Sequence, residues 1–323
     1  MTSKRINRDK QAILMCDLRE FCATLSSIQG QNSPDNEERI NRFYLFLDFY
    51  LKSLFEMVTV VIEFLNGKPI TRKKEITSKL FFNSGGDGAL LVLGGQSPEN
   101  VVSSYIYSFY LSCLLKKFVR KLEDTFNLSR LKRRMGIALA FGEVTAVEYS
   151  YKISKPGETG AGEFYNISSL ISQGINIASR VEGSNKDHIN ADISLDSSFT
   201  DELYRFMFPA LKVPGEYMKE FKTLKTKKER LDVLNMLDTC DIRLLLSYMG
   251  HHDMKGSDTV VHIVSPVLVN IDPDLEKNKV EESEELIDFY SAVKKKLGKD
   301  IYKDLVTPLQ AKLLTLMGEL EEL

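Results

Sequence analysis

The sequence predicts an α+β fold in which a mainly antiparallel sheet is flanked by long helices and followed by a helical C-terminal extension. Two short apolar runs, 12–16 and 259–266, are typical of strands. Two long segments, 37–66 and 99–126, predict helices of many turns. The expected order is strand, helix, helix, hairpin, helix, hairpin, helix, strand, which favours an antiparallel sheet over a regular βαβ array.

The first part of the chain is expected to hold a strand, a helix, a loop and a long helix. The apolar run AILMC ends at Asp17, where DLREFCATLSS can start a helix. Residues 29–37 form a polar loop with one proline, and the tetrapeptide NGKP ends the helix that follows, near residue 66.

The middle of the chain is expected to hold two hairpins. Strands at 79–83 and 88–93 are joined by SGGD, a hairpin turn. The segments RRMGIALAF and EVTAVEYSY predict a second hairpin around Gly142. Residues 151–163 predict a flexible loop, and a helix is expected from about 165 to 182.

The last part of the chain combines strands with charged helical segments. A strand is expected at 186–195, and a lysine-rich, mostly helical stretch at 198–248. We therefore expect a domain at 1–270 with a helical insertion at about 198–250, and a charged helical extension at 271–323.

Composition excludes several classes of function. The 323 residues carry a formal net charge of −2, which argues against a dominant nucleic-acid-binding surface. No stretch approaches the apolar length that crosses a bilayer, and MTSKRINRDKQ lacks the apolar core of a secretion signal. The four cysteines show no CxxC spacing. We expect reduced thiols in a cytoplasmic protein.

Two aspartates, Asp17 and Asp87, are placed where both could bind the same metal ions. Asp17 comes at the end of the first predicted strand, and Asp87 lies in the glycine turn GGDG of a hairpin that could lie beside it. Two such carboxylates can bridge a pair of divalent cations about 3.5–4 Å apart and so promote phosphoryl transfer. On the residues alone, a helix N-cap for Asp17 and a turn cap for Asp87 remain open.

A second group of polar residues follows in the segment NISSLISQGINIASRVEG. Asn176 and Arg180 are four residues apart and so share one face of a helix. An asparagine can hydrogen-bond a sugar, and an arginine can neutralise charge that builds on a phosphorus centre. Two ordinary polar residues on a surface helix are the alternative.

Five segments, in order, resemble the motifs of class III nucleotide cyclases. CDLREF at 16–21 resembles the signature D-[IL]-R-G-F, and GGDGALLV resembles the second metal-binding motif. MGIALAFGEV resembles the strand with a glycine turn that precedes the helix, and INIASR is similar to the helix motif V-N-x-A-[SA]-R. MKGSDTVVHIV at 254–264 resembles the end of the domain. The resemblance covers about residues 10–265.

The resemblance implies the class III cyclase fold and a two-metal cyclisation at a homodimer interface. Asp17 and Asp87 would hold two Mn²⁺ or Mg²⁺ ions. Asn176 would orient the ribose, Arg180 would stabilise the transition state, and Lys255 would contact the triphosphate. The ribose 3′-hydroxyl attacks the α-phosphorus and pyrophosphate leaves. Because metals and helix come from different subunits in this family, a symmetric dimer would build two composite sites.

Two further positions in the family read the base, and here they are Asn83 and Ser169. Adenylate cyclases typically carry Lys and Asp there, and guanylate cyclases Glu and Cys, so neither purine set is present. Asparagine offers both a donor and an acceptor, which suits the mixed edge of uracil or cytosine. Phe21, in the first signature, is added to the expected substrate-binding residues.

Three positions depart from the family motifs. Glu20 and Ser172 replace glycines, and Cys22 replaces a threonine. A glutamate beside a phosphate-binding turn would repel a triphosphate unless it points away. These departures therefore weaken the assignment of a phosphate-binding loop more than the assignment of the metal ligands.

The overall plan is similar to that of the pyrimidine cyclases of bacterial anti-phage systems (Pycsar). This resemblance implies a cytoplasmic uridylate cyclase, or a cytidylate cyclase, whose cyclic product is sensed by a separate effector protein. The alternatives are a purine cyclase of class III, a catalytically silent nucleotide receptor on the same fold, a diguanylate-type cyclase, and a polymerase-like or scaffold protein that shares only the sheet.

Two other features are interpreted as structural. The aromatic stripe on the first long helix is expected to serve core or dimer packing, with base stacking by one of its rings or by Phe82 as the alternative; its members are Phe43, Phe46, Phe49 and Phe55. The adjacent histidines 251 and 252 lack the spacing of a shared metal site.

Overall fold

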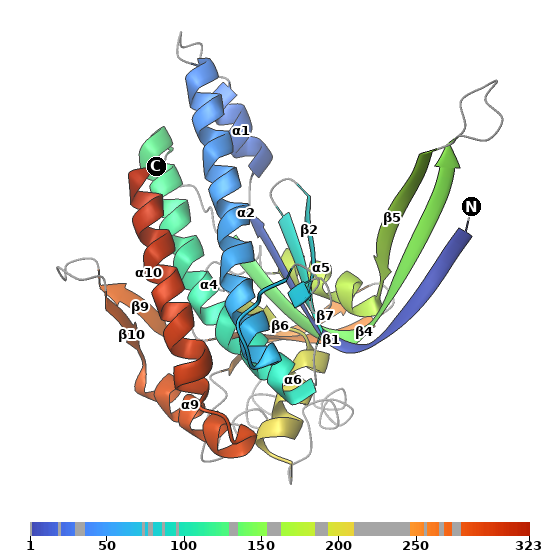
Figure 1. The fold of residues 1–323 in the computed structure, drawn as a ribbon. Coiled ribbons are helices and arrows are strands. Elements are labelled where there is room, and N and C mark those ends of the chain that lie inside the picture. The colour runs from blue at the N-terminus through green and yellow to red at the C-terminus, as the bar shows by residue number, and fades with distance from the viewer. Residues whose placement is uncertain are drawn as a thin grey trace.

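The fold is given by a computed structural model, and it combines one large sheet with long helices (Figure 1). The residues that the structure describes are 2–18, 21–29, 36–72, 75–76, 80–85, 88–94, 97–128, 135–153, 163–184, 193–209, 246–254, 257–264, 268–272 and 279–323.

Within the described residues, eight strands form one sheet in the order β2-β3-β1-β4-β6-β8-β7, with β5 paired to β4. The strands are β1 (Thr2–Leu18), β2 (Leu80–Gly85), β3 (Gly88–Leu93), β4 (Met135–Ile153), β5 (Glu163–Ile171), β6 (Ile193–Leu195), β7 (Leu246–Met254) and β8 (Ser257–Val264). Their pairings are antiparallel except for the parallel pair β4–β6. A separate pair joins β9 (Val269–Asp272) to β10 (Lys279–Glu282). The predicted α+β class with a mainly antiparallel sheet is confirmed.

The helices divide unequally between the two faces of the sheet. They are α1 (Phe21–Gln29), α2 (Asn36–Asn66), α4 (Ser97–Phe126), α5 (Gln173–Ser184), α6 (Ser197–Met207), α9 (Glu284–Leu297), the π-helical turn η2 (Tyr302–Val306) and α10 (Thr307–Glu322). Buried residues of α2, α4, α6, α9 and α10 share one large apolar cluster with the sheet, and α5 packs on two small clusters. We call these sides the bundle face and the α5 face.

The alternation of side chains along β1 shows why both faces are buried. Leu14 and Cys16 belong to the bundle-face cluster, whereas Ile13 and Met15 pack with residues of α5 on the other side. A continuous apolar run is the pattern expected of such a strand.

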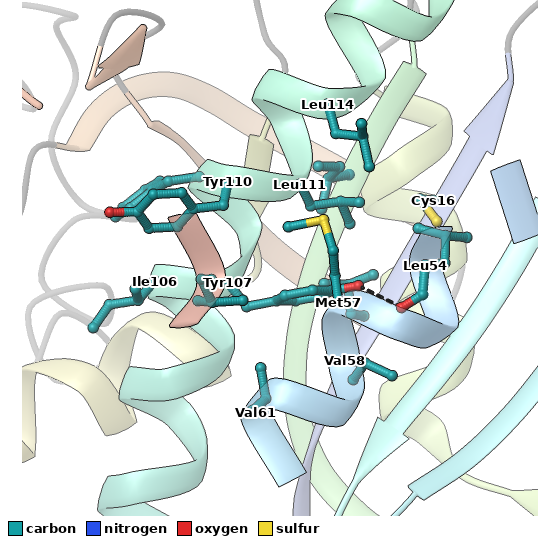
Figure 2. Close-up of a cluster of buried hydrophobic side chains, with 14 of the residues drawn as sticks. Cys16, Leu54, Met57, Val58, Val61, Ile106, Tyr107, Tyr110, Leu111 and Leu114 are labelled. Atoms are coloured by element: carbon teal, nitrogen blue, oxygen red, sulfur yellow. Dashed lines mark hydrogen bonds between the residues drawn. The ribbon is translucent and has the colours of Figure 1, made fainter. Parts of the chain in front are cut away.

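The bundle face holds most of the buried aromatic residues. Phe43 and Phe46 contact the ring of Phe126 on α4 edge-on. Figure 2 shows how Tyr107 of α4 reaches α2, where its hydroxyl donates to the carbonyl oxygen of Leu54 at 3.2 Å. The interpretation of the aromatic stripe as core packing is confirmed for Phe43 and Phe46, as for Phe49, which is 6% exposed.

Phe55 and Phe82 pack against each other edge-on, with ring centroids 6.1 Å apart. Phe82 also packs against the bundle-face cluster. It therefore lies on the opposite side of the sheet from α5.

The predicted second hairpin around Gly142 is wrong. β4 runs without a turn from Met135 to Ile153 and pairs with nearly the whole of β1, with an irregularity between Arg8 and Lys10. Gly142 pairs with Gln11 in the middle of this ladder, where the helix α5 lies over it. Figure 1 shows the outer ends of β1, β4 and β5 extending away from the helices.

The predicted helix from about 165 to 182 is wrong in its first third. Residues 163–171 form strand β5 along β4, and helix α5 begins at Gln173. The expected loop at 151–163 is strand as far as Ile153 and from Glu163 onward, and the residues between lie outside the described part of the chain. Residues 163–171 include types that suit either a helix or a strand, so their own sequence does not fix the structure. Hydrogen bonding to the neighbouring edge of β4 makes the segment a strand.

The first strand is longer than expected: the run 12–16 belongs to β1, which already begins at Thr2. Of the strand expected at 186–195 the structure describes only β6, and most of the loop expected at 29–37 also lies outside the described residues. The two long helices, the hairpin of β2 and β3, and strand β8 lie where expected. The mostly helical stretch expected at 198–248 begins with α6 but reaches strand β7 at Leu246, and 210–245 lies outside the described residues. The adjacent histidines 251 and 252 lie on β7.

The described helices of the C-terminal tail, α9 and α10, belong to the same apolar cluster as α2 and α4. Figure 1 shows α2, α4 and α10 side by side. None of the described helices has the length and apolar character that crossing a membrane requires.

Candidate functional site

Asp17 lies near the end of β1, on the α5 face. Its side chain follows Ile13 and Met15 in the alternation of the strand, and it is partly buried. The Oδ1 atom lies 3.3 Å from the point where a Cβ on Gly88 would stand. The carboxylate therefore points across the ladder toward the hairpin of β2 and β3.

The strand partners of Asp17 are glycines on both sides. Asp17 pairs with Gly88 of β3 and with Gly136 of β4, and Gly88 pairs in turn with Gly85 of β2. None of these three positions places a side chain beside the carboxylate. Gly88 is partly exposed, whereas Gly136 is buried. The glycine at 136 was not singled out from the sequence, because only the register reveals it.

Several expected site residues lie outside the described part of the chain. Asp87 and Lys255 are among them, as is Glu20. Phe21 lies in α1, but its side chain is not described. The described neighbours of Asp87 in sequence are the paired residues Gly85 and Gly88.

Asn83 shares the α5 face with Asp17, at a different level of the sheet. It pairs with Leu90 of β3, which pairs with Met15 of β1. Asn83 is exposed, and both Leu90 and Met15 are partly buried. With strands about 4.8 Å apart, the backbones of Asn83 and Met15 are separated by roughly 10 Å. An open polar side chain thus lies within a nucleotide's length of the carboxylate.

Ser169, the second expected base-reading residue, lies elsewhere on the sheet. It pairs with Val147 of β4, whereas the row of Asn83 reaches β4 at Ala138. Nine residues of strand separate these two positions, about 30 Å along the path of β4. One chain therefore does not place Asn83 and Ser169 in the same row, and the side chain of Ser169 is not described.

Helix α5 presents Asn176 and Arg180 away from the sheet. Ala178 and Val181 are fully buried in the two clusters of the α5 face. Asn176 and Arg180 are exposed, one turn apart on the outer surface of the helix. The amide and the guanidinium thus face outward, where a second molecule that approaches this face would meet them.

Cys16, next to Asp17 in sequence, is not available as a ligand. Its Sγ lies 3.3 Å from the hydroxyl of Tyr50, on the bundle face. Burial raises the pKa of the Cys16 thiol to about 12, although the hydrogen bond with Tyr50 acts in the opposite direction. The thiol is therefore neutral near pH 7.

The residues present fit a divalent metal of the hard type. Mg²⁺ is commonly held by one or two carboxylates together with substrate phosphates, and Asp17 supplies one such carboxylate. Among the described residues, no three His, Cys, Asp or Glu side chains converge on one point as a complete metal cage.

Comparison with known proteins gives likenesses to solved structures only. No protein-family model matches the chain, and no curated protein matches it. The chain is similar to the crystal structure of the guanylyl cyclase Cya2, with 14% identity over 81% of this chain and 93% of that one and a TM-score of 0.40. It is also similar to the adenylyl cyclase CyaB from P. aeruginosa, with 13% identity over 85% of this chain and 100% of that one and a TM-score of 0.41.

A third similar structure is the catalytic core of a rhodopsin-guanylyl cyclase with converted specificity in complex with ATPalphaS. It shares 12% identity over 82% of this chain and 100% of that one, with a TM-score of 0.40. This chain thus spans almost the full length of all three proteins.

Proposed function

We propose that this chain is a nucleotide cyclase of the class III type that converts a pyrimidine nucleoside triphosphate, UTP or CTP, into its 3′,5′-cyclic monophosphate and pyrophosphate. One observation carries the proposal. The glycine-flanked carboxylate of Asp17 and the outward-facing pair Asn176 and Arg180 lie on the same side of the sheet. This is the arrangement that two copies, face to face, would need to complete each other's sites.

The reaction requires one new bond and one broken bond at the α-phosphorus. The ribose 3′-oxygen attacks, the bond to the bridging oxygen of pyrophosphate breaks, and the 3′-hydroxyl proton passes to solvent. Asp17 and Asp87 would hold two Mn²⁺ or Mg²⁺ ions. When bound, such ions lower the pKa of the attacking hydroxyl and stabilise the leaving pyrophosphate.

The remaining groups act on orientation and charge. Asn176 of the second copy would hold the ribose so that its 3′-oxygen lies in line with the leaving group. Arg180 of the same copy would stabilise charge on the α-phosphoryl group in the transition state. Lys255 and Phe21 would contribute triphosphate and substrate contacts.

The choice of a pyrimidine base is supported by Asn83. Its side chain is exposed on the α5 face and offers one donor and one acceptor. A short asparagine suits the mixed edge of uracil or cytosine, and a second polar contact from Ser169 would have to come from the other copy, because one chain places the two residues far apart. UTP is the preferred substrate in this proposal.

The biological role that follows is antiviral signalling in bacteria. A separate effector protein would sense the cyclic nucleotide. Residues 1–270 would form the catalytic unit, and the tail at 271–323 would support or regulate it.

The direct test offers purified protein each of the four ribonucleoside triphosphates with Mn²⁺ and identifies the products by mass spectrometry. We expect a cyclic product from UTP or CTP, none from ATP or GTP, and none in the presence of excess EDTA. Product from a purine triphosphate alone would overturn the choice of base. Tight nucleotide binding without any product would instead indicate a silent receptor.

Complementation tests the composite site. Asp17→Asn and Arg180→Ala should each lower turnover by at least about 100-fold, because each removes one half of both sites. After the two variants are mixed and allowed to exchange subunits, half of the dimers are mixed and each regains one intact site. We expect activity to return to about a quarter of wild type. Activity that stays at the level of the separate variants would show that metal and helix residues act within one chain.

A further inference from the structure

The first turn of α5 is fixed to the sheet by one serine. The Ser172 hydroxyl donates to the carbonyl oxygen of Glu143 on β4 at 2.8 Å. It also accepts from the backbone N–H groups of Gly174 at 3.0 Å and Ile175 at 3.4 Å. A serine hydroxyl has one donor and two acceptor positions, so its bonding capacity is used in full. Ser172 is 9% exposed, which shields these bonds from water.

The contacts around Ser172 leave the helix little freedom to shift. A Cβ on Gly174 would stand 2.5 Å from Cδ1 of Ile13, which shows how closely the helix lies on β1. A Cβ on Gly142 would stand 3.7 Å from the Cα of Gly174. The same strand, four residues after Ile13, carries Asp17. The residues that contact the first turn of α5 and the candidate metal ligand Asp17 thus belong to the same pair of strands, β1 and β4.

We propose that Ser172 is a positioning residue for the cyclisation: its hydroxyl fixes α5 on β4 and thereby sets the place of Asn176 and Arg180 in the composite site. The inference rests on the proposed function. Asn176 and Arg180 lie about one and two turns beyond the cap, so a shift of the cap moves both side chains together. A misplacement of about 1 Å can cost on the order of 100-fold in rate.

The test compares Ser172→Ala with Ser172→Thr and with a matched control. Ser283 caps α9 in the same way, since its Oγ accepts from the backbone N–H of Leu286 at 3.3 Å, and it lies outside the candidate site. Ser283→Ala thus removes a helix cap without removing a bond like that from Ser172 to the carbonyl oxygen of Glu143 on the sheet. Each variant is assayed for kcat and KM with the pyrimidine triphosphate, and hydrogen exchange is followed over residues 173–184 and 284–297.

We expect Ser172→Ala to lower kcat by at least about tenfold while KM changes by less than about threefold, because the arginine acts mainly in the transition state. Ser172→Thr, which keeps the hydroxyl, should stay within about threefold of wild type, and Ser283→Ala within about twofold. Exchange over 173–184 should quicken in Ser172→Ala alone. Together these results would support the proposal.

Three results would overturn it: wild-type kcat in Ser172→Ala, a threonine variant as impaired as the alanine variant, or a loss of activity matched by a loss of folded dimer. The activity of the wild-type protein separates a failure of the proposed function from a failure of the positioning role. If wild type forms no cyclic product, the proposed function falls and the catalytic role of Ser172 falls with it. If wild type is active and Ser172→Ala behaves like Ser283→Ala, the positioning role alone is wrong.

Discussion

The carboxylate of Asp17 lies between strand neighbours that have no side chains. Gly88 and Gly136 pair with Asp17 on either side. A Cβ atom added to Gly88 would stand 3.3 Å from Oδ1 of Asp17. A contact of this length is tighter than an ordinary van der Waals contact, so either the carboxylate or the strand must move to admit a methyl group. A methyl group at position 88 would therefore displace either the candidate metal ligand or the strand that carries it.

Gly88→Ala should disturb metal use more than folding. We expect the Mn²⁺ concentration for half-maximal cyclase activity to rise by about threefold to tenfold, because the displaced carboxylate binds the ion less well. A Mn²⁺ titration of activity measures this.

The control for this prediction is Gly318→Ala on α10, where an added Cβ meets nothing within 4 Å. It should leave the Mn²⁺ dependence unchanged. An unchanged dependence in Gly88→Ala as well would show that the side chain of Asp17 does not act through the metal.

Helix α5 and the β1–β4 ladder form the element on which the site depends. Gly142 and Gly174 face each other where the helix starts, and Ile13 fills the remaining space under Gly174. Ile13 is fully buried, so its δ-methyl group can move only if the side chains packed around it also move. Small residues thus set how closely the helix lies on the sheet.

Gly174→Ala and Ile13→Val should therefore be coupled in stability. The first is expected to cost about 1–3 kcal/mol by overpacking, and the second about 0.5–1.5 kcal/mol by loss of one methyl group. In the double variant the valine makes room for the new methyl group, so we expect the summed cost to be reduced by at least about 1 kcal/mol. Urea unfolding of the four proteins measures this coupling. Additive costs within about 0.5 kcal/mol would contradict the close contact.

At the level of the whole molecule, the C-terminal helix α10 completes the bundle. Leu309, Leu313 and Leu316 are fully buried, and α10 contacts both α2 and α4. Ion pairs at its surface, such as Lys52 with Glu319 at 2.7 Å, are exposed. Apolar burial rather than surface charge is thus the main attachment of this helix.

Leu313→Ala should destabilise the entire chain. We expect a loss of about 2–5 kcal/mol in the free energy of unfolding, since the cavity opens in the shared core. Lys52→Ala, the control, should cost less than about 1 kcal/mol. Unfolding followed by circular dichroism should show one transition. Two transitions, of which only one responds to Leu313→Ala, would show that the tail folds as a separate unit.

Local pattern was sufficient for much of the fold. The helices α2 and α4 and the hairpin of β2 and β3 are specified by apolar periodicity and by glycine turns, which act over a few residues. The roles expected for residues 17, 176 and 180 came from the resemblance of their segments to class III cyclase motifs, since on the residues alone a helix N-cap and an ordinary surface helix remained open. Asp87 and Lys255 stay predictions, because they lie outside the described residues.

The tertiary structure decided whatever depends on partners distant in sequence. Gly142 has the residue type of a turn, but β1 pairs across it and α5 lies on it, so the strand continues. The segment at 163–171 could have been helix, but the open edge of β4 made it a strand. The glycines beside Asp17 and the bonds of Ser172 likewise exist only once the strands are in register, because hydrogen bonding across a sheet, not local propensity, sets which residues meet.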